Sequence, residues 1–61
     1  MVHVTYKLDR ELDKIVVWVT EPEEKNIYTL NIQTRISIKR QVKGFVEDEL
    51  GLVPTTLTLR H

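Results

Sequence analysis

The sequence predicts an α+β domain in which a mixed four-stranded sheet carries one helix across one face. Three observations predict it. In three segments before residue 33, apolar side chains alternate with polar ones or β-branched residues run together, which is typical of strands. Between Ser37 and Leu50 the apolar residues recur mainly at steps of three and four, which is typical of one helical face. Alternation returns after Pro54, so the predicted order is β-β-β-α-β.

The first two strands are predicted from different patterns. Residues 2–8 alternate strictly, so their four apolar side chains are expected to face inward from a half-buried strand. Residues 14–20 contain a β-branched run that fits a second strand. The connection between them is short, and we therefore expect an antiparallel hairpin.

A charged turn and a third strand follow. The segment 21–26 contains Pro22, which presets the backbone of a turn, and charged side chains that favour water. Residues 27–32 resume an extended pattern in which Tyr28, Leu30 and Ile32 are in phase. These residues predict a third strand with that set facing the core.

The helix has recognisable ends. Ser37 is a plausible N-cap, and Gly51 stands where a left-handed C-terminal cap is expected. Residues 55–60 alternate again and predict the last strand, with Leu57 and Leu59 facing inward. The apolar stripe of the helix consists of Ile38, Val42, Phe45, Val46 and Leu50.

Size and composition limit the protein to one thin-cored domain spanning residues 1–61. A chain of 61 residues buries only about 60% of the surface that its unfolded form exposes. It has no cysteine, so neither a disulfide nor a thiolate-bound metal strengthens it. Small domains of this kind often need a partner for stability. We therefore expect self-association, with a homodimer as its simplest form.

The charge balance and the apolar runs exclude other classes. Nine Lys and Arg residues balance nine Asp and Glu residues, which argues against a dedicated nucleic-acid binder. The longest apolar run, 15–19, is far too short for a membrane span or the core of an export signal. The expected location is therefore the cytoplasm, with no membrane partner.

Residues 14–60 resemble the ubiquitin-like, or β-grasp, family. The similar pieces, in chain order, are the first strand at 14–20, its hairpin turn at 21–26, the second strand at 27–32, the helix at 37–50 and the Gly-Leu-Val-Pro of 51–54. This resemblance implies a β-grasp-like fold and a role in protein binding. The chain lacks the late strand and the diglycine of conjugated members, so the resemblance does not imply conjugation.

The sharpest functional prediction comes from the second strand. If Ile15, Val17 and Val19 face the helix, Val16 and Trp18 face the opposite side of the sheet. Exposed apolar patches with tryptophan usually mark interfaces. The reversed phase, with Trp18 in the core and Ile15, Val17 and Val19 outside, is the alternative. The predicted protein-binding residues are Val16, Trp18, Ile27 and Thr29.

A second candidate surface lies on the helix. Basic residues gather at its N-terminal half and acidic residues at its C-terminal half, opposite to the arrangement that the helix dipole favours. This arrangement is either a solvated face or a basic patch for phosphates, nucleic acid or an acidic partner beside an acidic patch. The two oppositely charged ends of the helix could also pair head to tail between molecules. The residues of the predicted basic patch are Arg35, Lys39, Arg40 and Lys43.

Open sheet edges offer a third binding route. An unpaired edge strand can accept a strand of a partner. From the sequence we expect this edge at 2–8 or at 55–60, depending on strand order. The alternative is that the charge of Lys7 or Arg60 serves only to keep other strands from pairing there.

Nothing in the sequence predicts catalysis. The two histidines, His3 and His61, lie near the ends of the chain, where a catalytic constellation is difficult to hold. The acidic clusters lack calcium-loop spacing, and no glycine-rich phosphate loop is present. We therefore expect no enzyme activity, no metal and no cofactor.

Overall fold

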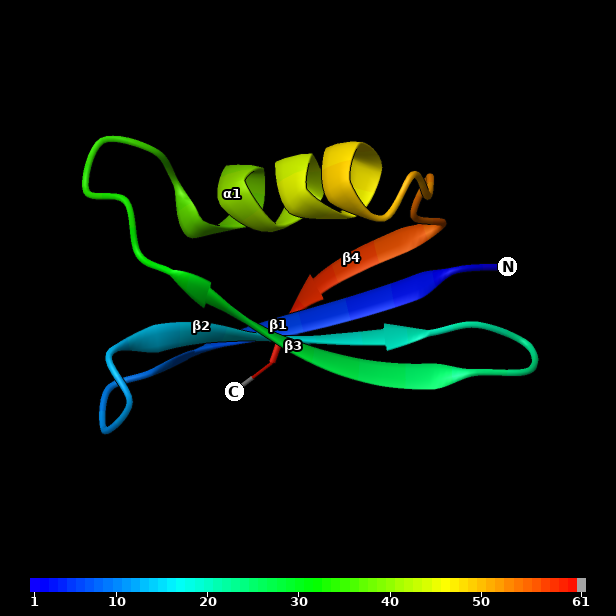
Figure 1. The fold of residues 1–61 in the computed structure, drawn as a ribbon, viewed down its shortest axis with the longest axis horizontal. Helices are drawn as coiled ribbons and strands as arrows, with labels where there is room; N and C mark the ends of the chain where they lie inside the picture. Colours follow the sequence, from blue (N-terminus) through cyan, green and yellow to red (C-terminus); the bar gives the residue numbers. More distant parts are fainter. Residues whose placement is uncertain (61) are drawn as a thin grey trace.

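The computed structural model describes residues 1–60 as a four-stranded sheet with helical turns across one face (Figure 1). The predicted α+β class and the β-β-β-α-β order are confirmed. Strand bounds differ from the predicted ones by two residues or fewer. The elements are β1 (His3–Asp9), β2 (Lys14–Thr20), β3 (Lys25–Asn31), α1 (Ile38–Gly44), a π-helical turn η1 (Phe45–Glu49) and β4 (Thr56–Leu59).

The strand order across the sheet is β3-β2-β1-β4. β2 pairs antiparallel with both β1 and β3, as short hairpin connections require, whereas β4 pairs parallel with β1 after crossing the sheet through α1. The sheet is therefore mixed. Of the two predicted alternatives for an open edge, 55–60 is confirmed and 2–8 is wrong, because β4 docks on the free side of β1 and makes β1 an interior strand. The edges are β3 and β4.

The core lies between the inner face of the sheet and the helical segment. Ile15, Val17 and Val19 on β2 are at most 2% exposed, so this alternating set faces the helix as predicted. The helix contributes Val42 and Val46, both fully buried. The remaining buried side chains are Val4 and Tyr6 of β1.

The helical segment begins and ends at the predicted caps, but its second half is not the regular α-helix that the sequence predicts. The Ser37 hydroxyl accepts a hydrogen bond from the Arg40 N–H at 3.2 Å, and Gly51 has a φ of 67°, in the left-handed region. Between them the α-helix widens into a π-helical turn, in which the Leu50 N–H donates to the Phe45 carbonyl at 3.3 Å. Phe45, Val46 and Leu50 all pack on the core.

The connection between β3 and α1 is held by one side chain. The Gln41 Oε1 accepts from the Gln33 N–H, and the Gln41 Nε2 donates to the Gln33 carbonyl, both at 3.0 Å. The same amide donates to the Ile36 carbonyl at 2.7 Å. Gln41 thus satisfies backbone groups that follow β3, as a neighbouring strand would.

No helix in residues 1–60 has the length and apolar character needed to cross a membrane.

Candidate binding surfaces

The face of the sheet that points away from α1 carries the four residues predicted to bind a protein. Strand register places Trp18 opposite Ile27 on β3, and Val16 opposite Thr29. Because side chains alternate along a strand, these four residues occupy two adjacent rows of one face. We call this surface, made by the outward-facing side chains of the sheet, the outer face.

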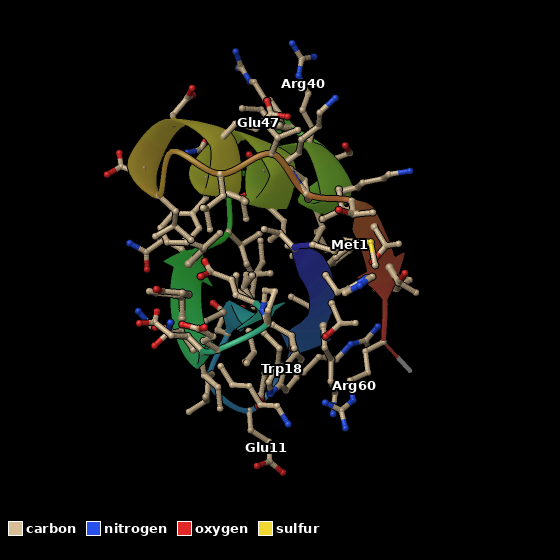
Figure 2. All side chains as sticks on the ribbon, turned by 90° about the vertical axis from the view of Figure 1, so that its right-hand side faces the viewer. Met1, Glu11, Trp18, Arg40, Glu47 and Arg60 are labelled. Atoms are coloured by element: carbon tan, nitrogen blue, oxygen red, sulfur yellow. The ribbon has the colours of Figure 1, made fainter. Side chains whose placement is uncertain are left out.

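Trp18 lies on this outer face. It is half-buried, and its neighbours Val17 and Val19 point the other way into the core. Figure 2 shows Trp18 and Arg60 on the side of the sheet opposite the helix. Ile27, the residue of β3 that stands opposite Trp18, is 66% exposed. The alternative phase, with Trp18 in the core, is therefore wrong.

Arg60 belongs to the same surface, although from the sequence we expect it only to protect an open edge from pairing. Its backbone N–H donates to the Tyr6 carbonyl at 2.7 Å, which continues the pairing of β4 with β1. Its guanidinium carbon lies 4.6 Å from the centre of the Trp18 ring, within cation–π range. Alternation along 55–60 already pointed Arg60 outward, but only the strand order brings it to Trp18.

The outer face is also positively charged. By alternation, β1 contributes Lys7 to it, β2 contributes Lys14 and β3 contributes Lys25. With Arg60 they make four cations, and the one acidic side chain among the outward residues of the four strands is Asp9. One cation is held in place, because the Lys14 Nζ donates to the Asn31 Oδ1 at 3.0 Å. These four cations lie far apart in the sequence, and only the pairing of the strands gathers them on one face.

The predicted basic patch of the helix lies on another side of the molecule. All four of its residues are exposed, and Figure 2 shows Arg40 pointing away from the sheet, as does the acidic Glu47. The structure therefore separates the helix cations from the outer face by the full thickness of the domain. The patch consists of Arg35 in the β3–α1 connection and of Lys39, Arg40 and Lys43 in α1.

A groove opens between β3 and the helical segment. Since α1 packs mainly over β1 and β4, the inner side of β3 is only partly covered. Tyr28 on β3 meets Phe45 edge to face, with ring centres 5.3 Å apart, at the covered end. The groove has a volume of about 690 Å³, and Leu30, Ile36 and Phe45 contribute its apolar lining.

The described residues show no arrangement typical of a metal site. No group of three or more His, Cys, Asp or Glu side chains converges within residues 1–60. The His3 Nδ1 lies 2.8 Å from the Thr56 Oγ1, a contact that joins β1 to β4. His61, the second histidine of the sequence analysis, lies outside the described residues.

Comparison of the chain with known protein families, curated protein sequences and solved structures found no match. The resemblance to the ubiquitin-like family stays a prediction from the sequence.

Proposed function

We propose that this protein is a non-catalytic interaction module that binds an acidic partner protein through the outer face. The observation that carries the proposal is the position of Trp18 beside Ile27, with cations on the strands around them. Exposed apolar side chains on a small domain favour an interface, and the surrounding charge selects the partner. The ubiquitin-like resemblance agrees with a role in protein binding.

The charge of the outer face disfavours one form of self-association. In a face-to-face homodimer the same patch meets itself, so Lys7, Lys25 and Arg60 of one copy would approach the cations of the other. Like charges brought together across an interface oppose binding. A different protein with carboxylates around an apolar centre avoids this repulsion.

Trp18 and Arg60 are suited to form the centre of such an interface. Tryptophan and arginine are enriched among the residues that dominate binding energy. The cation–π contact holds the Arg60 guanidinium over the indole, so both groups lose less freedom when a partner arrives. Incoming carboxylates would meet the guanidinium, and apolar side chains would meet Val16 and Ile27.

Selection from a random peptide display library against the folded chain tests this function. We expect selected peptides to combine Asp or Glu with apolar residues and to lose binding to the variant Trp18→Thr, which keeps a strand-forming residue. A double variant on the helix, Lys39→Glu with Arg40→Glu, is the control and should bind as the wild type does. Peptides that bind Trp18→Thr equally well would refute the proposal.

The exposed basic patch of the helix supports a second candidate, the binding of nucleic acid or another polyphosphate. Fluorescence anisotropy with a labelled oligonucleotide would measure it over a series of salt concentrations. Binding through phosphates weakens as a power of the salt concentration. It should be lost in the Lys39→Glu and Arg40→Glu double variant and kept in Trp18→Thr, the reverse of the outcome for a peptide on the outer face.

A further inference from the structure

Strand β3 leaves one row of backbone groups without a partner in the described chain. In the β2–β3 hairpin the Glu21 N–H donates to the Glu24 carbonyl at 2.7 Å, so this is a hydrogen-bonded pair. Bonded and non-bonded pairs alternate in an antiparallel ladder. Following the register, the N–H and C=O groups of residues 26, 28 and 30 point to β2, while those of Ile27 and Thr29 point outward.

The edge formed by β3 lacks the features that usually protect an edge strand. Native edges are kept apart by proline, bulges, inward charges or a very short strand. β3 is seven residues long, pairs with β2 without a bulge, and from Asn26 to Asn31 contains neither proline nor a charged residue. The opposite edge, β4, has only four residues.

The inner side of this edge is also open. Ile36 is 39% exposed and Leu30 is only partly buried, and both line the groove between β3 and the helical segment. An added strand beside β3 would therefore complete the backbone pairing and cover apolar side chains at the same time.

We propose that the strand added at this edge is β3 of a second copy of the chain. In an antiparallel pair related by a two-fold axis at Tyr28, the whole strand overlaps, and Ile27 stands opposite the partner's Thr29. Both residues direct their backbone groups outward, so the hydrogen bonds of the two copies match. Lys25, the single charge of the strand, stands opposite the neutral Asn31 of the partner.

Charges on the helical segment favour this occupant over an unrelated peptide. α1 runs back across the sheet in the direction opposite to β3 (Figure 1). A two-fold axis perpendicular to the sheet makes the helices of the two copies antiparallel on the same side. Arg40, Lys43, Glu47 and Asp48 all line the groove beside β3, so in this dimer the two grooves adjoin with their basic and acidic ends in opposite order.

The dimer also bears on the outer face. Both outer faces lie on the same side of the joined sheet, and Ile27 continues the apolar row toward the partner's β3. The proposed partner protein would then meet two copies of the Trp18 site. The edge pairing itself does not depend on that function, because Trp18 lies on β2.

Analytical ultracentrifugation tests the pairing. The wild type should move from the chain mass of 7.2 kDa to twice that mass as concentration rises from micromolar to millimolar. Thr29→Pro removes one outward N–H from each copy and leaves the hydrogen bonds to β2 in place. The dissociation constant of the dimer should therefore increase by about tenfold or more. Thr29→Val keeps the N–H and should still dimerise, as should Trp18→Thr.

Leu59→Pro is the matched control, because it places a proline on β4, the opposite edge of the sheet, and should leave the dimer intact. A measurement without mutation covers the case in which Thr29→Pro fails to fold. Hydrogen exchange followed by NMR should show the amides of Ile27 and Thr29 becoming protected as concentration rises. A wild type that stays monomeric, a Thr29→Pro dimer as stable as the wild type, or exchange at these amides that ignores concentration would each overturn the proposal.

Discussion

The guanidinium carbon of Arg60 lies 4.6 Å from the centre of the Trp18 ring. The two residues come from strands that are not neighbours, since β1 lies between β2 and β4. Arg60 therefore reaches across β1 and covers part of the indole. This contact joins the end of the described chain to the centre of the outer face.

Removing the Arg60 side chain should expose Trp18. In Arg60→Ala we expect the tryptophan emission to shift to longer wavelength and its quenching by acrylamide to increase. Stability should fall by no more than about 1 kcal/mol, because the cation–π contact is at the surface. Trp18 is the single tryptophan, so its fluorescence reports this site alone. Arg60→Lys keeps the positive charge, so its emission wavelength and quenching should lie between those of the wild type and of Arg60→Ala. An unchanged emission in Arg60→Ala would contradict the contact.

Adjacent valines on β2 should respond very differently to truncation. Val17 is fully buried in the core, whereas Val16 is half-buried on the outer face. We expect Val17→Ala to lower the free energy of unfolding by about 2 kcal/mol and Val16→Ala by less than about 1 kcal/mol. Urea denaturation followed by circular dichroism measures both. Equal losses would mean that β2 has no preferred inner face.

The two glycines should respond in opposite directions to alanine. Gly44 has helical φ and ψ of −60° and −43°, and a Cβ added there meets no atom within 4 Å. Gly44→Ala should therefore stabilise the protein by up to about 1 kcal/mol. Gly51→Ala should destabilise it by about 1 kcal/mol, because a φ of 67° is unfavourable for a residue with a Cβ. Thermal unfolding of both variants checks the pair, and a loss of stability in Gly44→Ala would argue against the helical geometry at residue 44.

The amide of Gln41 should stabilise the connection that follows β3. Gln41→Leu loses all three hydrogen bonds to the backbone of Gln33 and Ile36, at a cost of about 1–2 kcal/mol because the site is partly exposed. Gln41→Glu keeps the acceptor for the Gln33 N–H and loses both donors, so an intermediate cost is expected. Denaturant unfolding gives the stabilities, and amide exchange at Gln33 should accelerate most in the leucine variant. A leucine variant as stable as the wild type would show that these bonds contribute nothing net.

The sequence by itself determined the elements and, in 2–8 and in the helix, which side chains face the core. Strict alternation in 2–8 and the three-and-four spacing of the helix are local patterns, and burial of Val4 and Val42 follows them. The run 15–19 is apolar throughout, so its pattern left two phases open, and the structure decided that Val17 is buried. Ser37 and Gly51 marked the ends of the helical segment for the same reason, because capping involves only neighbouring backbone groups.

Only the tertiary structure decided which side of β1 receives β4, because parallel pairing through a crossover joins residues far apart in the chain. That choice makes β3 an edge, brings Arg60 to Trp18 and gathers four cations on one face. The π-helical turn at Phe45–Glu49 likewise accompanies packing on the sheet and has no local sequence pattern. Alternation indicated which side chains of a strand share a face, and strand order decided which side chains of different strands meet.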